Sequence, residues 1–233
     1  MRVGIIICAA GKGSRVGGDT PKQFIKIGGL RIVDYTIISA IDCGKFDDVV
    51  VVIRPGDEKE YSFCNDRVKL VHGDTEDGQN SRRLGLNYLK DELGYCDDDL
   101  VAVMDGNRPF VFPDFYEVLI EEAKKFGNAI PYIIQKDILV REKDGRSSIL
   151  EFPRSEIKAT LAPIVFKFGE FWDVYDEAYK NGTLKDSEGA ITLILKRLMK
   201  EGRDDELHYV KGDVGHFKIT TPDDVHLAEM IMS

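Results

Sequence analysis

A short apolar run near the start of the chain, residues 3–8, leads directly into a glycine-rich turn. Such a run has no polar face and is typical of a strand buried on both faces of a parallel sheet. Similar apolar runs recur at residues 49–53 and 100–104, and residues 68–71 predict a further short strand. Segments with the apolar spacing of helices lie among them, at residues 32–40, 81–93 and 113–126.

Strands that alternate with helices predict right-handed βαβ units. We therefore expect a Rossmann-like, three-layer α/β/α fold with a mostly parallel central sheet. The 233 residues contain no repeat, low-complexity tract or Pro/Ser-rich linker, so a single domain over residues 1–233 is expected. Because 43% of the residues are hydrophobic, the chain can bury a sizeable core, which excludes a disordered protein.

One segment, residues 135–152, breaks this alternation. Two extended runs flank Lys143-Asp144-Gly145-Arg146, and Asp-Gly between extended runs predicts a β-hairpin. An isolated two-stranded ribbon is only marginally stable in water. We therefore expect the hairpin to protrude as an inserted dimerisation arm that packs on a second copy of the chain. The alternative is a hairpin that folds back on its own domain.

The charge is unevenly distributed along the chain. Acidic residues outnumber basic ones, 41 to 32, so the net charge is −9 with neutral histidine. This balance argues against a general nucleic-acid-binding protein. Residues 1–30 differ, because five of them are basic and one is acidic. A basic segment in an acidic chain suggests a local anion-binding site.

The four cysteines, at positions 8, 43, 64 and 96, form no C-x-x-C pair and have no histidine at metal-ligand spacing. Neither a zinc site nor a disulfide scaffold is expected. No apolar stretch reaches the length of a signal-peptide core or of a membrane span. These features predict a cytoplasmic protein with reduced thiols and no membrane partner.

The turn after the first strand reads AAGKGSRVGG over residues 9–18. Small residues let backbone N–H groups approach a phosphate, and Lys12 and Arg15 add positive charge. Neither common phosphate motif fits. Val16 takes the third glycine position of a dinucleotide fingerprint, and Gly13 follows Lys12 where a P-loop has Ser or Thr. The loop alone does not exclude the alternative of a structural turn whose charged residues bind no anion. Lys22, in the Pro-Lys-Gln-Phe that follows, favours the anion site.

The loop together with Pro-Lys-Gln-Phe resembles the signature of the polyol-phosphate cytidylyltransferases. Known members act on 2-C-methyl-D-erythritol 4-phosphate in isoprenoid synthesis or on ribitol 5-phosphate in wall and capsule polymers. Three further segments resemble family motifs in the family's order, NSRRLGL at 80–86, MDGNRPF at 104–110 and KITTPDD at 218–224. The resemblance covers nearly the whole chain, and residues 135–152 fall where the family has its dimer arm.

This resemblance implies an enzyme that transfers CMP from CTP to a small phosphorylated polyol and releases pyrophosphate. The attacking phosphate monoester is already largely ionised at neutral pH, since its second pKa is about 6. No general base is therefore required, and catalysis depends on positioning and on neutralising charge.

The matched motifs also imply the residues that bind the nucleotide. Three cations are candidate catalytic residues, namely Arg15, Lys22 and Lys218. The nucleotide would be bound by the glycine-rich loop and the following helix start, at Ala9, Ala10, Gly11, Lys12, Gly13 and Ser81. In that set, cytosine would be read by backbone groups of Ala9 and Ala10 and by Ser81. The alternative for Ser81 is a helix N-cap.

The resemblance assigns a metal ligand and an acceptor site as well. Asp105 would hold Mg²⁺ through one oxygen, with phosphates and waters completing the shell; the alternative is a strand-end aspartate in a turn. The acceptor would be bound by Arg108, Lys136, Asp137 and Arg154.

Several acceptor positions depart from the family pattern. Ile138 stands where the arm motif has threonine, and Ala162 and Ile164 flank Pro163 where the family has Thr-Pro-Gln. Two hydroxyls and an amide are thereby replaced by apolar groups, and the loss of such hydrogen-bond partners strongly changes substrate preference. We therefore expect a retained nucleotide site and a changed acceptor.

Three other functions stay open at this point. One is a nucleotidyltransferase of the same fold with another NTP or with a sugar-phosphate or phosphonate acceptor. The second is a catalytically silent nucleotide-binding homologue, which is disfavoured because Lys22, Asp105 and Lys218 are all present. The third is a nicotinamide oxidoreductase, which Val16 and the cations of the loop disfavour.

Overall fold

The computed structural model describes residues 1–11, 20–62, 67–149, 152–185 and 189–232. Its strands are β1 (Val3–Cys8), β2 (Lys26–Ile27), β3 (Leu30–Arg31), β4 (Asp48–Ile53), β5 (Val68–His72), β6 (Leu100–Asp105), β7 (Asn128–Ile134), β8 (Val140–Lys143), β9 (Arg146–Ile149), β10 (Lys158–Thr160), β11 (Ile164–Lys167) and β12 (Tyr209–Lys211). Its α-helices are α1 (Ile32–Cys43), α2 (Gly78–Asp91), α3 (Pro113–Phe126), α4 (Phe168–Lys180), α5 (Ala190–Glu201) and α6 (Pro222–Met232).

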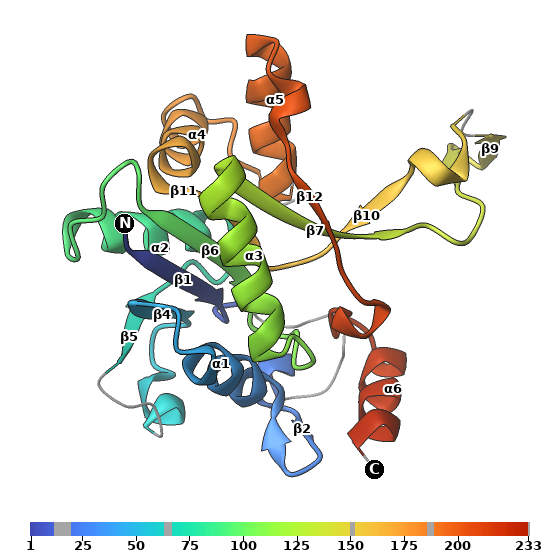
Figure 1. Cartoon of the computed structure of the whole chain (residues 1–233). Coiled ribbons are helices and arrows are strands. Elements are labelled where there is room, and N and C mark those ends of the chain that lie inside the picture. Colours follow the sequence, from blue (N-terminus) through green and yellow to red (C-terminus); the bar gives the residue numbers. More distant parts are fainter. Residues whose placement is uncertain (12–19, 63–66, 150–151, 186–188, 233) are drawn as a thin grey trace.

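A mostly parallel sheet forms the centre of the fold (Figure 1). Within the described ranges it has eight strands in the order β10-β7-β11-β6-β1-β4-β5, and β12 pairs with β7. The strands from β6 through β1 and β4 to β5 run parallel, whereas β11 is antiparallel to both of its neighbours. Helices cover both faces of the sheet, so the predicted three-layer α/β/α fold is confirmed.

Side chains that alternate along β1 divide the apolar core into two parts. Ile5 and Ile7 pack on one face of the sheet in a cluster that includes residues of α1 and α3. Ile6 points to the other face, where residues of α2, α4 and α5 cover it. Burial on both faces explains why the central strands are continuous apolar runs in the sequence.

Strand β1 is also the point at which the order of the sheet reverses, because β4 lies on one side of it and β6 on the other. In open α/β sheets, ligands bind beyond the carboxyl ends of the strands at such a switch point. Cys8 and Asp105, the last residues of β1 and β6, are paired in register. The loops that follow them therefore lie at one edge of the sheet.

The helix expected at 81–93 begins earlier, at Gly78. Asp77 caps it, because its side chain accepts hydrogen bonds from the backbone N–H groups of Gln79 and Asn80. Ser81 lies inside the helix, so the alternative that Ser81 is its N-cap is wrong.

The predicted hairpin is confirmed as the antiparallel pair β8 and β9, which projects away from the body of the molecule (Figure 1). The chain reverses at Asp144 and Gly145, whose φ angles of 54° and 71° suit a type I′ turn. Apolar side chains on the projecting segment are exposed, at 75% for Ile138, 60% for Val140 and 65% for Phe152. The packing of the arm on a second copy stays a prediction.

None of the helices in the described ranges combines the length and the apolar content that crossing a membrane requires. Cys8, Cys43 and Cys96 carry free thiols, and Cys64 lies outside the described residues.

Gly85 lets helix α2 approach β1 and β4 closely. A Cβ atom at this position would lie 2.7 Å from Ile6 Cγ2 and 3.1 Å from Val52 Cγ2. We expect Gly85→Ala to lower the free energy of unfolding by about 1–2 kcal/mol, because overpacking exceeds the helix preference of alanine. Urea denaturation measures this, with Asp91→Ala at the exposed end of the same helix as the control. An unchanged midpoint for Gly85→Ala would contradict the tight packing.

Candidate active site

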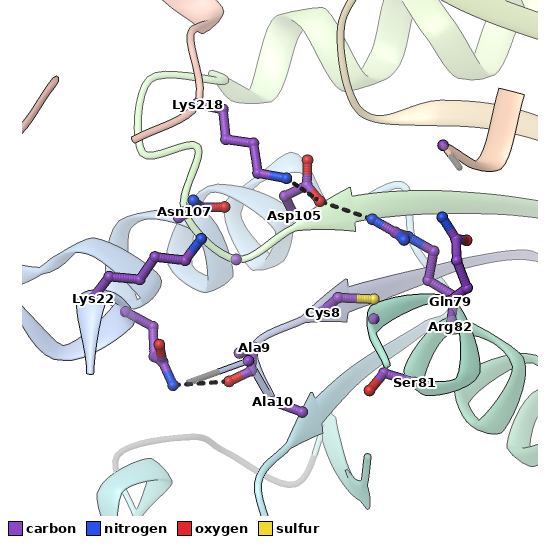
Figure 2. Close-up of a pocket in the computed structure, with 15 residues that line it drawn as sticks. Cys8, Ala9, Ala10, Lys22, Gln79, Ser81, Arg82, Asp105, Asn107 and Lys218 are labelled. Atoms are coloured by element: carbon purple, nitrogen blue, oxygen red, sulfur yellow. Dashed lines mark hydrogen bonds and ion pairs between the residues drawn. The ribbon is translucent and has the colours of Figure 1, made fainter. Parts of the chain in front are cut away.

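A cavity of about 270 Å³ lies at the carboxyl ends of β1 and β6 (Figure 2). Its wall brings together seven of the residues that the sequence singles out, namely Ala9, Ala10, Gly11, Lys22, Ser81, Asp105 and Lys218. Lys22 extends into the cavity from the side opposite Arg82 (Figure 2). Residues that are distant in the chain thus share one crevice.

Asp105 is the electrostatic centre of this cavity. Its Oδ1 lies 3.1 Å from Lys218 Nζ and 3.0 Å from Arg82 Nη2, and its Oδ2 lies 3.2 Å from Arg108 Nε. Burial acts to raise the pKa of Asp105, but the three cations outweigh it and hold the pKa far below its usual range. Asp105 is therefore an anion throughout the pH range of ordinary assays.

The loop after β6 holds Lys218 beside Asp105. Asn107 accepts a hydrogen bond from Ile219 N–H through its backbone oxygen at 3.0 Å, and its side-chain Nδ2 donates to Ile219 O. Arg108 Nη1 donates to the backbone oxygen of His216 at 2.7 Å. These three hydrogen bonds flank Lys218 on both sides, so they fix the backbone that carries it.

The side of the cavity expected to take cytosine is built from close backbone contacts. Ala9 N–H donates to Val52 O at 2.8 Å, and Ala9 O accepts from Gln23 Nε2 at 3.0 Å. The Ser81 hydroxyl donates to Asp74 O at 2.8 Å and accepts from Asp74 N–H at 2.9 Å. Ala9 N–H and the Ser81 hydroxyl proton thus have protein partners, while Ala9 O and the Ser81 oxygen can each accept a further hydrogen bond. The reading of cytosine by Ala9, Ala10 and Ser81 stays a prediction.

A second cavity, of about 180 Å³, adjoins the first. Four residues line both cavities, namely Arg82, Asp105, Gly189 and Lys218. The rest of the second cavity is mainly apolar, with Val103, Met104, Leu161, Ala162, Ile164, Ala190 and Ile191 on its wall. Charged residues therefore lie between the two cavities, and the second combines an apolar part with Arg108 and Thr160.

The remaining predicted site residues have different positions. Arg108 lines the second cavity. Lys136 and Asp137 are exposed between β7 and β8, and neither is among the residues that line the two cavities. Arg154 begins a short 3-10 turn, Arg154–Glu156. Three residues of the loop lie outside the described residues, namely Lys12, Gly13 and Arg15.

Comparison with known proteins decides the family. The model of the IspD family, 2-C-methyl-D-erythritol 4-phosphate cytidylyltransferase, matches residues 3–233. The chain belongs to this family. The predicted family is thus confirmed, and the protein is a nucleotidyltransferase of the cytidylyltransferase type.

Relatives named 2-C-methyl-D-erythritol 4-phosphate cytidylyltransferase align over nearly the full length. The protein from Caldicellulosiruptor bescii is 31% identical, and the alignment spans 100% of this chain and 98% of the relative. The protein from Clostridium beijerinckii is 29% identical, and the alignment spans 97% of this chain and 96% of the relative. A solved synthase from Anaerococcus prevotii has a TM-score of 0.81 at 23% identity, covering 99% of this chain and 96% of its own, and supports the fold.

The cavity offers one carboxylate for a metal ion. Among the described residues, no group of three or more His, Cys, Asp or Glu side chains is arranged to hold a metal. A hard divalent cation that also binds phosphates needs only one or two carboxylates, since phosphate and water oxygens complete its shell. Asp105 fits such an ion when a triphosphate is bound, in competition with Lys218 and Arg82 for Oδ1.

Sequence reasoning missed four polar residues of the first cavity, namely Gln23, Gln79, Arg82 and Asn107. Arg82 lies within the motif at 80–86, and Gln23 lies between Lys22 and Phe24 of another motif. Gln79, buried at the start of α2, accepts a hydrogen bond from the Tyr175 hydroxyl at 2.6 Å. Their proximity to recognised motif residues was the available signal, but their contacts depend on the fold.

Asn107 is a positioning residue whose loss should loosen Lys218. Asn107→Ala removes the side-chain donor to Ile219 O, and we expect kcat to fall about tenfold or more while the Kd for CTP changes little. Steady-state pyrophosphate release and equilibrium binding measure the two quantities. Asn181→Ala, at an exposed helix end, is the matched control. A folded Asn107→Ala protein with the wild-type kcat would contradict this role.

Proposed function

We propose that this protein transfers CMP from CTP to a small phosphorylated polyol with release of pyrophosphate. The observation that carries the proposal is the wall of Arg82, Asp105 and Lys218 between two adjoining cavities. A transferase of this type must bring two phosphates together, and a wall with two cations lining both cavities is suited to that task. Family membership supports the same reaction.

In this proposal the first cavity binds CTP. Ala10 and the tightly packed residues around it take the cytosine. Gly73 lies behind this wall, where a Cβ atom would come within 2.7 Å of Ala10 Cβ. Lys22 and Lys218, with Lys12 and Arg15 from the loop, bind the triphosphate, and Gly11 and Gly13 let the backbone approach it. A compact pocket of this kind favours a pyrimidine over a purine by shape.

The chemistry is an in-line displacement at the α-phosphorus. An oxygen of the acceptor phosphate forms a bond to the α-phosphorus, and the bond from that phosphorus to the bridging oxygen breaks. Pyrophosphate leaves with the bonding electron pair, and no proton transfer is needed because the acceptor is already ionised. Lys218 and Lys22 stabilise the charge that develops on the transferring group.

We propose Mg²⁺ as the cofactor, held by one oxygen of Asp105. When bound, it neutralises charge on the nucleotide phosphates. Asp105 remains ionised at all working pH values because cations surround it, so it stays available as a ligand. The free thiols of Cys8, Cys43 and Cys96 support the proposal that the protein works in the cytoplasm.

The first candidate acceptor is 2-C-methyl-D-erythritol 4-phosphate, the substrate in the names of the relatives. A second candidate, a phosphate with fewer hydroxyls, is favoured by the apolar wall that Leu161, Ala162 and Ile164 give the second cavity. In either case we propose that Arg108 and Lys218 bind the acceptor phosphate, since both line the second cavity. Arg154, Lys136 and Asp137 stay candidates for acceptor binding, contributed by the arm region.

A substrate panel tests the proposal. We expect pyrophosphate release with CTP and not with ATP, GTP or UTP. The acceptors are 2-C-methyl-D-erythritol 4-phosphate, ribitol 5-phosphate and a butanediol monophosphate. Rapid turnover of the first would rule out the changed-acceptor hypothesis, and selective turnover of the last would support it. CTP binding without any release would identify a catalytically silent homologue, and release with other NTPs would refute the cytosine assignment.

We also propose that the chain forms a homodimer through the arm at residues 135–152. The exposed apolar side chains of the arm support this, because water disfavours such a surface on a free ribbon. We expect the double variant Ile138→Asp, Val140→Asp to elute as a monomer in size-exclusion chromatography with light scattering. Glu142→Lys, on the same exposed ribbon, is the control and should remain dimeric. A monomeric wild-type protein would refute the proposal.

A further inference from the structure

We propose that Arg82 binds the acceptor phosphate and holds it against the nucleotide, as a catalytic residue of the transfer. The inference rests on the proposed function. It assigns a role to a cation on the first half of α2 that lies apart from the glycine-rich loop.

The position of Arg82 supports this role. Its side chain is only 16% exposed, yet it lines both cavities. Figure 2 shows Arg82 and Lys218 reaching Asp105 from different directions, with dashed lines to the carboxylate. A group on this wall can contact ligands in the two cavities at once.

The hydrogen bonds of Arg82 leave it free to take a ligand. A guanidinium carries five N–H donors, and Asp105 is the one side chain in the described ranges to which Arg82 donates, through Nη2 at 3.0 Å. Arg82 shares Oδ1 with Lys218, while Arg108 holds Oδ2. Asp105 would therefore keep two cationic partners if Arg82 turned toward an incoming phosphate.

The groups around Arg82 also favour an anionic ligand. Cys8 and Tyr175 lie near Arg82, and a thiol and a phenol both keep their protons at neutral pH. Asp105 is thus the one negative charge among the described side chains named here, and it is shared by three cations. This excess of positive charge suits a phosphate dianion.

Arginine fits the requirement better than lysine would. Two phosphate anions must approach within bonding distance, and a planar guanidinium can donate two parallel hydrogen bonds to one phosphate while its remaining donors face another acceptor. As the acceptor oxygen bonds to the α-phosphorus and pyrophosphate leaves, Arg82 offsets the charge of the attacking group. Lys218 does the same for the transferring group.

Arg82→Gln tests the role, with Arg83→Gln as the matched control. Arg83 is the next residue of the same helix, but its guanidinium stacks on Tyr179 at 3.6 Å and donates to Asn80, and it lines neither cavity. For Arg82→Gln we expect the acceptor KM to rise about tenfold or more and kcat to fall about 10²-fold. The Kd for CTP should stay within about threefold, and inorganic phosphate should weaken as a competitor of the acceptor. Arg83→Gln should match the wild type.

Arg82→Lys should show intermediate defects, because lysine keeps the charge but loses the two-pronged geometry. It also serves as the test if Arg82→Gln fails to fold. Three outcomes would overturn the assignment. The acceptor KM could be unchanged in Arg82→Gln, the acceptor KM and the CTP Kd could rise by the same factor, or Arg83→Gln could show the same defect. A wild-type protein that releases no pyrophosphate with any substrate pair would instead refute the proposed function.

Discussion

A buried carboxylate with three cations around it connects the parts of this site. Asp105 could not remain ionised at the end of a buried strand without Lys218, Arg82 and Arg108. Without Asp105, the burial of each cation would in turn cost free energy, because the described residues around it supply little other negative charge. The cluster therefore ties together β6, the first half of α2 and the segment before α6. The charged residues that line both cavities are held by the same contacts.

The sheet determines where this cluster forms. Because the strand order reverses at β1, the loops after β1 and β6 open at one edge, with Cys8 and Asp105 side by side. The cluster then lies between two adjoining cavities and lines both of them. In the proposed function a substrate phosphate replaces Asp105 as the partner of a cation, so the charges that stabilise the cluster also suit anionic substrates.

The central strands could be predicted from the sequence because burial on both faces leaves a continuous apolar run. The short strands β10, β11 and β12 could not, since three or four residues at antiparallel or outer positions carry no comparable pattern. Asp105 and Lys218 were recognisable because each belongs to a family motif. Asn107 lies inside a family motif but was not among the predicted site residues, and the structure shows it bonded to both backbone groups of Ile219.

The sequence by itself determined the alternation of strands and helices, the hairpin at its Asp-Gly turn and the family to which the chain belongs. These features depend on local spacing and on short motifs, which are readable without coordinates. Only the tertiary structure decided that Arg82 meets Asp105 and that Arg108 holds the backbone of His216, contacts that join residues 23 and 108 positions apart. The physical reason is that ion pairing depends on distance in space. That distance is set by how the sheet and helices pack, and not by any local pattern of residues.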